Sequence, residues 1–114
     1  MAITLGYVTI DCADPRTLGR FWSQALGWSI TYEEDDGVLL AGTADACPQL
    51  FLQAVPESKT VKNRVHVDLG ADDFTAELGR LVGLGASVLN QTGDDTKQSA
   101  VLADPEGNEF CLAG

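Results

Sequence analysis

The stretch DPRTLGRFWSQALG, from Asp14 to Gly27, is the clearest structural signal in the chain. Asp14 is a favoured N-cap residue, and Pro15 suits the first helical position because the N–H that it lacks has no partner there in any helix. Gly27 is suited to end the helix because glycine readily adopts left-handed backbone. Apolar residues recur between these ends at helical spacing: Leu18, Phe21, Trp22 and Ala25. The stretch therefore predicts a helix whose apolar side packs against a sheet.

Strand patterns lie on both sides of this helix. Residues Ile3–Asp11 alternate loosely and are rich in β-branched side chains, which favours a strand. After the helix, the acidic sequence EEDDG indicates a turn between strands. The strands expected there are Trp28–Tyr32, Val38–Ala41 and Gln49–Val55. The first half of the chain thus predicts a βαβββ unit.

The same order of patterns returns after the polar connector PESKTVKN. A strand is expected at Arg64–Gly70, followed by a helix that the sequence ADD caps and that Gly85 ends. The apolar face of this second helix is expected to hold Phe74, Leu78, Leu81 and Val82. Three more strands are expected at Ser87–Asn90, Ser99–Ala103 and Glu109–Leu112, with the turn DPEGN before the last of them.

The two halves match along their length. A constant offset places Tyr7 on His66, Asp14 on Asp73 and Phe51 on Phe110, and both helices end in Leu-Gly. Such self-similarity indicates a tandem repeat. We therefore predict an α+β fold of two tandem βαβββ modules that form a curved mixed sheet around a cavity, with the helices on the outer face. The chain is expected to be one domain, residues 1–114, with module one at about 1–58 and module two at about 59–114.

The composition is that of a single globular domain. The chain has 114 residues, 45% of them hydrophobic and 21% charged, which is enough for a core without disulfides. Its three cysteines have unrelated spacings, which favours reduced thiols in the cytoplasm over a disulfide framework or a zinc ribbon. The sequence has neither a secretion signal nor an apolar stretch of about 20 residues, so no membrane span is expected.

The net charge of −10 bears on the partners of the protein. Nucleic acids and anionic membranes are not expected, because binding to phosphate depends on clustered Lys and Arg. A small molecule is the expected partner, and the charge would attract a cationic one. High solubility explains the same charge equally well.

The chain resembles the vicinal oxygen chelate superfamily, and within it the small glyoxalase-like or bleomycin-resistance-like proteins. The residues that carry the resemblance are DPRTLGRFWSQALGW in the first half and VHVDLGADD, LGA and DPEGNEF in the second. The resemblance implies the paired βαβββ fold but no single activity, because the superfamily includes isomerases, dioxygenases, thiol transferases and metal-free drug-binding proteins.

The resemblance also implies where a metal site would lie. Metal-dependent members hold a divalent ion with one side chain from the first and one from the last strand of each repeat. These positions fall on four residues of this chain: Tyr7, Leu52, His66 and Cys111. Only His66 is a usual ligand, because Leu52 has no donor atom, Tyr7 is a poor ligand for such ions and a thiolate suits soft zinc rather than a hard octahedral ion. A one-residue shift would bring in Gln53, which is then expected to face the helices. We therefore expect no metal and no cofactor.

The cavity lining is the remaining candidate site. We expect a ligand to contact Tyr7, Trp28, Leu52, Arg64, His66, Asp68, Glu109 and Cys111. Alternation along the strand is expected to turn Arg64, His66 and Asp68 to the cavity and Val65 to the helices. His66, the only histidine, is the candidate acid or base, although a structural role is equally compatible with its position. Cys111 is either a nucleophile beside His66 or a small packed thiol.

The function expected first is that of a metal-free small-molecule-binding protein that sequesters a cationic or aromatic compound. The alternative is a lyase, isomerase or dioxygenase of the same superfamily that acts on a small carbonyl compound, using His66 with or without a divalent metal. A third hypothesis is an accessory module. We also expect a homodimer, because one short chain with open sheet edges leaves strands and apolar surface to cover.

Overall fold

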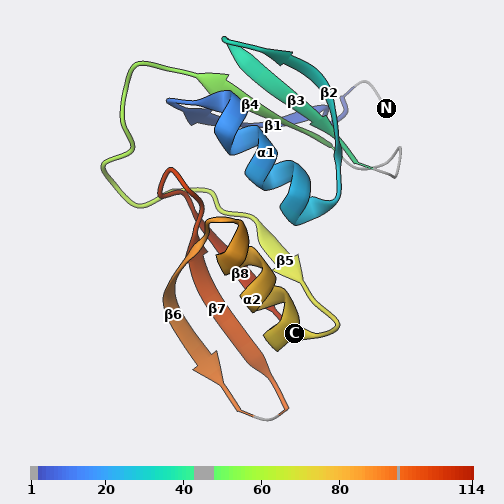
Figure 1. The fold of residues 1–114 in the computed structure, drawn as a ribbon, viewed down its shortest axis with the longest axis vertical. Helices are drawn as coiled ribbons and strands as arrows, with labels where there is room; N and C mark the ends of the chain where they lie inside the picture. The colour runs from blue at the N-terminus through green and yellow to red at the C-terminus, as the bar shows by residue number, and fades with distance from the viewer. Residues whose placement is uncertain (1–2, 43–47, 95) are drawn as a thin grey trace. The chain divides into compact units, whose positions relative to one another are not determined.

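The computed structural model describes residues 3–42, 48–94 and 96–114, and divides the chain into two compact units (Figure 1). Unit 1 spans Met1–Ser58 and unit 2 spans Lys59–Gly114. The predicted α+β class is confirmed, since the described residues form two helices and two four-stranded mixed sheets. No helix in the described ranges is both long enough and apolar enough to cross a membrane.

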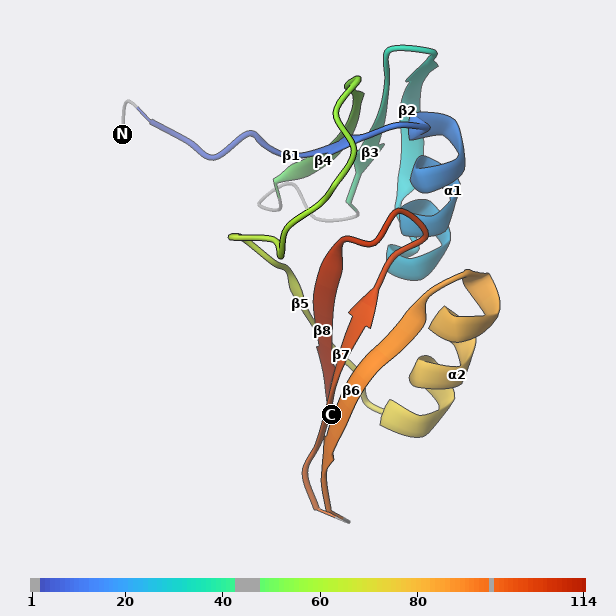
Figure 2. The same cartoon turned by 90° about the vertical axis from the view of Figure 1, so that its left-hand side faces the viewer.

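Unit 1 is a βαβββ module. Its elements are β1 (Tyr7–Cys12), α1 (Pro15–Leu26), β2 (Ser29–Glu34), β3 (Gly37–Ala41) and β4 (Gln49–Ala54). The strands lie in the order β1-β4-β3-β2, and β1 runs parallel to β4 while the other pairs are antiparallel. Helix α1 contacts β2, β3 and β4 on one face of this sheet, as Figure 2 shows.

Unit 2 repeats this topology. Its elements are β5 (Asp68–Gly70), α2 (Phe74–Leu84), β6 (Ser87–Gly93), β7 (Gln98–Ala103) and β8 (Glu109–Ala113). The strand order is β5-β8-β7-β6, again with one parallel pair, between β5 and β8. The prediction of two tandem βαβββ modules is therefore confirmed. The predicted cavity and the outward position of the helices depend on how the units are placed, and they stay predictions.

Both helices begin and end where the sequence predicts. The Asp14 and Asp73 carboxylates accept hydrogen bonds from the backbone N–H groups of Thr17, at 3.2 Å, and Ala76, at 3.1 Å. Gly27 and Gly85 follow the last helical residues with φ of 70° and 126°, values that favour glycine. These contacts join residues close in sequence, which is why local patterns predict them.

The core of unit 1 lies between α1 and its sheet. Leu18, Phe21 and Trp22 are buried, and the two rings meet edge to face with centroids 5.3 Å apart. Gly19 lets α1 approach β3 closely, because a Cβ added at this position would lie 2.6 Å from Cγ1 of Val38. The sheet contributes Val38, Leu40, Leu50 and Leu52 to this core.

The turn before β8 is built around a buried carboxylate. Asp104 Oδ1 accepts hydrogen bonds from the backbone N–H groups of Glu106, at 2.9 Å, and Asn108, at 3.0 Å. Gly107 has a φ of 88°, which the described non-glycine residues avoid. The interpretation of DPEGN as a structural turn agrees with this network.

Two predicted strands are shorter than expected. The first begins at Tyr7 rather than Ile3, and Ile3 is 82% exposed. The strand predicted at Arg64–Gly70 is reduced to Asp68–Gly70, because pairing with β8 begins only at Cys111. Val65 was expected to face the helices and is instead 77% exposed.

Candidate functional site

Strand alternation in unit 2 separates a core face from an open face. On β8, Phe110 and Leu112 are buried on the core face, while Cys111 between them is half-buried. Cys111 pairs with Asp68 across the parallel β5–β8 ladder, and the N–H of Cys111 donates to the carbonyl of Val67 at 3.0 Å. Side chains paired in this way lie on the same face of a sheet. Asp68 and Cys111 therefore meet on the open face.

Three predicted site residues form one cluster there: His66, Asp68 and Cys111. Nδ1 of His66 lies 3.0 Å from Oδ1 of Asp68. Each of the three side chains offers one atom that could bind a metal, Sγ in the case of Cys111, and these atoms all lie within 4.8 Å of one another. The sequence prediction that these residues share a face agrees with this placement.

The surroundings of Cys111 raise the pKa of its thiol. Burial raises its pKa, the charge of Asp68 and a hydrogen bond from the thiol to that carboxylate raise it further, and Lys62 opposes them. Because the thiolate is the nucleophilic form of cysteine, this environment argues against a thiolate–imidazole nucleophile.

Glu109, predicted to bind a ligand, is bound within unit 2 instead. Its Oε1 accepts from the backbone N–H of Asn63 at 2.9 Å, and its Oε2 accepts from Nζ of Lys59 at 3.1 Å. The hydrogen bond from Asn63 is the largest of the effects that lower the pKa of Glu109 to about 2. The carboxylate therefore anchors the connector to the start of β8, which also explains why residues before Val67 leave the sheet.

The register of β4 corrects one predicted site residue. Leu52 was expected to face the cavity, but it is fully buried in the core and pairs with the buried Val38. Gln53, expected to face the helices, is exposed. The offset between the repeats changes by one residue before β4, and a one-residue shift exchanges the two faces of a strand.

The corrected register identifies the unit 1 residues that correspond to the cluster. Thr9 pairs with Phe51 across β1 and β4 just as Asp68 pairs with Cys111 across β5 and β8. Thr9 and Phe51 are open-face residues that the sequence reasoning missed. The Phe51 ring lies over Gly37, where an added Cβ would overlap it. The alternation of LFLQ, with Gln53 on the same side as Phe51, was the signal that could have found them.

The other predicted site residues, Tyr7, Trp28 and Arg64, do not belong to the His66 cluster. Tyr7, the counterpart of His66, begins β1 and is 56% exposed. Trp28 lies just before β2 and is half-buried, and its carbonyl accepts from Oγ of Ser23 at 2.6 Å. Arg64 is exposed and lies outside β5, and it has no ion pair with any residue that the structure describes.

The donor set does not fit the metal site of the superfamily. Unit 2 offers an imidazole and a thiol at the two family positions, with a carboxylate beside them. At the corresponding positions unit 1 offers Tyr7 and Phe51, next to Thr9. None of these three supplies the nitrogen or carboxylate donors that hard divalent ions prefer.

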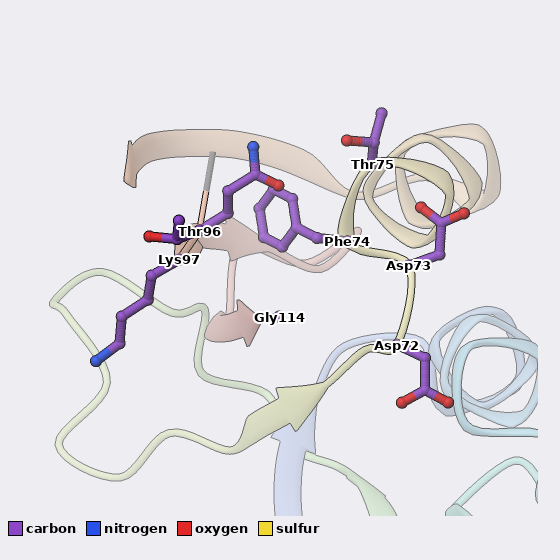
Figure 3. Close-up of a pocket in the computed structure, with 8 residues that line it drawn as sticks. Asp72, Asp73, Phe74, Thr75, Thr96, Lys97 and Gly114 are labelled. Carbon is purple, nitrogen blue, oxygen red and sulfur yellow. The ribbon is translucent and has the colours of Figure 1, made fainter. Parts of the chain in front are cut away.

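A pocket of about 350 Å³ lies elsewhere on unit 2, at the N-terminus of α2 (Figure 3). It is lined by Asp72–Thr75, Thr96–Gln98 and Gly114, and by none of the predicted site residues. Its charged residues are Asp72, Asp73 and Lys97, and the Asp73 side chain caps the helix. The pocket is therefore separate from the His66 cluster.

The repeated βαβββ topology is that of the vicinal oxygen chelate superfamily. Residues 7–113 match the family described as "Glyoxalase-like domain", and the chain belongs to that family. No curated protein matches the sequence.

Solved structures share the fold at low identity. A glyoxalase/bleomycin resistance protein/dioxygenase family enzyme from Burkholderia phytofirmans PsJN superposes with a TM-score of 0.78 at 18% identity, covering 97% of this chain and 98% of that chain. The hypothetical protein SA1046 from S. aureus gives 0.75 at 17%, covering 99% and 94%. The fosfomycin resistance protein FosX from Mesorhizobium loti gives 0.75 at 14%, covering 99% and 92%. At these identities the likeness concerns the fold alone.

Proposed function

We propose that this protein binds a small organic molecule without the help of a metal ion. The observation that carries the proposal is the corrected register: where unit 2 has His66, Asp68 and Cys111, unit 1 has Tyr7, Thr9 and Phe51. A four-ligand site with contributions from both modules thus lacks its unit 1 donors.

The ligand of this proposal is aromatic or cationic. Phe51 and Tyr7 give the open face of the unit 1 sheet two aromatic rings that its core does not use, and such rings stack on planar groups and attract cations. The net charge of −10 favours a cationic compound over an anionic one at long range.

A second candidate function is an enzyme of the lyase, isomerase or dioxygenase type that acts on a small carbonyl compound. The specific observation in its favour is the 3.0 Å contact between His66 and Asp68, because a carboxylate-bound imidazole is a common general base. The His66 side chain is 40% exposed, so a substrate can reach it.

The first experiment combines metal analysis with a ligand screen. Protein purified without a histidine tag should contain no stoichiometric metal, and aromatic cations should raise its melting temperature equally with and without a chelator. Phe51→Ala should remove the ligand-induced shift, while Val65→Ala, at an exposed position in unit 2, should keep it. Stoichiometric metal that a chelator and His66→Ala both remove would refute the proposal. Turnover of a carbonyl compound that His66→Ala abolishes would favour the second candidate.

We also propose that the protein is a cytoplasmic homodimer. Strand β6 is an edge strand of the unit 2 sheet and carries the exposed apolar residues Val88 and Leu89. Unprotected apolar edges pair readily with a second chain. The two cysteines that the structure describes, Cys12 and Cys111, are not in a disulfide, which is typical of a reducing compartment.

A further inference from the structure

The carboxylate of Asp68 lies between two polar side chains in the His66 cluster. Its Oδ1 is 3.0 Å from Nδ1 of His66, and Sγ of Cys111 on β8 lies within 4.8 Å of the ligand atoms of both residues. Strand pairing fixes the backbone positions of Asp68 and Cys111, since the two residues are direct partners in the β5–β8 register. Asp68 is therefore held by the sheet while His66 lies outside it, in the segment that precedes β5.

We propose that Asp68 is a positioning residue that holds His66 in the Nδ1–H tautomer and so presents Nε2 as the hydrogen-bond acceptor for a hydroxyl group of the ligand, such as that of a phenol or an enol. The part of this inference that concerns the ligand rests on the proposed function. The part that concerns the tautomer of His66 does not.

The tautomer follows from the donor and acceptor inventory. An ionised carboxylate only accepts hydrogen bonds, so the nitrogen that lies 3.0 Å from it carries the proton. In a neutral imidazole the other nitrogen then has a free lone pair. Nδ1 faces Asp68, which leaves Nε2 for the ligand.

The hydroxyl class of ligand follows from the same arrangement. The free nitrogen of a neutral imidazole accepts, and its natural partner is an O–H or N–H donor. A phenol or enol hydroxyl is more acidic than an alcohol and forms a correspondingly stronger bond with a basic nitrogen. A ligand in which the hydroxyl is methylated cannot donate, which provides a matched pair of probes.

The tautomer can be measured without ligand. His66 is the only histidine, so both imidazole resonances in a 15N NMR spectrum belong to it, and only Nδ1 and Nε2 remain to be distinguished. At pH 8.5, where histidine side chains are generally neutral, the wild type should show Nδ1 protonated. Asp68→Ala should convert this to a mixture with the Nε2–H form, and Asp68→Asn, which retains an acceptor oxygen, should restore it in part. Asp72→Ala removes the same charge from an exposed position and should change nothing. Asp68 is 71% exposed, so its variants should fold, which circular dichroism checks.

Phenol and its methyl ether, anisole, test the ligand half. Phenol should shift the Nε2 resonance in the wild type while anisole should not. Asp68→Ala should weaken phenol binding by about twofold to fivefold, because only the molecules with an unprotonated Nε2 can then accept the hydrogen bond. An Nε2–H tautomer in the wild type would overturn the whole inference. No response to phenol, or equal responses to both probes, would overturn the ligand half. If the screen with aromatic cations succeeds nonetheless, the proposed function stands while this inference fails. If His66 has the Nδ1–H tautomer but the ligand screen fails, the positioning role of Asp68 stands and the proposed function fails.

Discussion

Leu52 and Phe51 are neighbours on β4 with opposite surroundings. Leu52 is buried against the core that α1 covers, whereas Phe51 lies on the open face beside Gly37. The repeat in the sequence predicts the opposite orientation, because its offset aligns Phe51 with Phe110 and both residues are aromatic. Aromatic side chains stabilise cores and ligand sites equally well, so residue type alone did not decide between the faces.

Truncating these two neighbours should separate stability from binding. Leu52→Ala should lower the free energy of unfolding by about 2–5 kcal/mol, because it opens a cavity in a fully packed core. Phe51→Ala should cost less stability but abolish the ligand-induced rise in melting temperature. Urea denaturation measures the first effect and the thermal-shift screen measures the second. A larger loss of stability in Phe51→Ala than in Leu52→Ala would contradict the register described above.

Glu109 should make stability depend on pH in the acid range. Its pKa is lowered from 4.5 to about 2 in the folded protein, chiefly by the backbone N–H of Asn63. A carboxyl group whose folded pKa is depressed stabilises the protein above its unfolded pKa and loses that contribution as the pH falls through its folded pKa. The wild type should therefore be more stable than Glu109→Gln at pH 6, and the difference should shrink between pH 5 and pH 2. A difference that grows on acidification would refute this role.

Helix α1 meets its sheet at a glycine, although glycine is a poor helix former. Gly19 lies against Val38, whose β-branched side chain has little freedom to move away. Glycine at position 19 thus lowers the intrinsic helix propensity of α1 but allows the helix to lie closer to β3. Helix α2 contains Gly79 and Gly83, and neither has a neighbouring atom within 4 Å of an added Cβ.

Matched substitutions should show this difference between the helices. Gly19→Ala should destabilise the protein by about 1–3 kcal/mol, since the overlap with Val38 outweighs the gain in helix propensity. Gly79→Ala should instead stabilise it by about 0.5–1 kcal/mol. Guanidinium denaturation of both variants provides the comparison, and Val38→Ala should relieve the cost of Gly19→Ala in a double-mutant cycle. Equal stabilisation by both alanines would show that α1 does not need its close approach.

At the scale of the whole molecule, each unit leaves sheet surface uncovered. Strand β6 is exposed along its whole length, and Leu89 is 55% exposed. Natural proteins protect such edges with charges, with short strands or with a partner. Strand β6 has no charged side chain, which supports the proposed homodimer.

A charge on this edge should therefore dissociate the dimer. Leu89→Lys should convert a dimer into a monomer in light scattering coupled to size-exclusion chromatography, because an unpaired charge would be buried at the interface. Thr75→Lys adds the same charge at an exposed position of α2 and should leave the dimer intact. A wild type that is monomeric at 100 µM, or a Leu89→Lys variant that stays dimeric, would exclude this edge as the interface.

The sequence by itself determined the helix ends, the repeat and the βαβββ order. The caps at Asp14, Gly27 and Asp73 act over a few residues, so a local pattern contains all the information that they need. The common face of Asp68 and Cys111 was also within reach of strand alternation, whereas His66 lies before β5, outside the strand. Only the tertiary structure decided the orientation of β4, the short β5 and the capture of Glu109 by Lys59 and Asn63. These features depend on pairing between residues far apart in sequence, where a shift of one residue exchanges the buried and open faces of a strand.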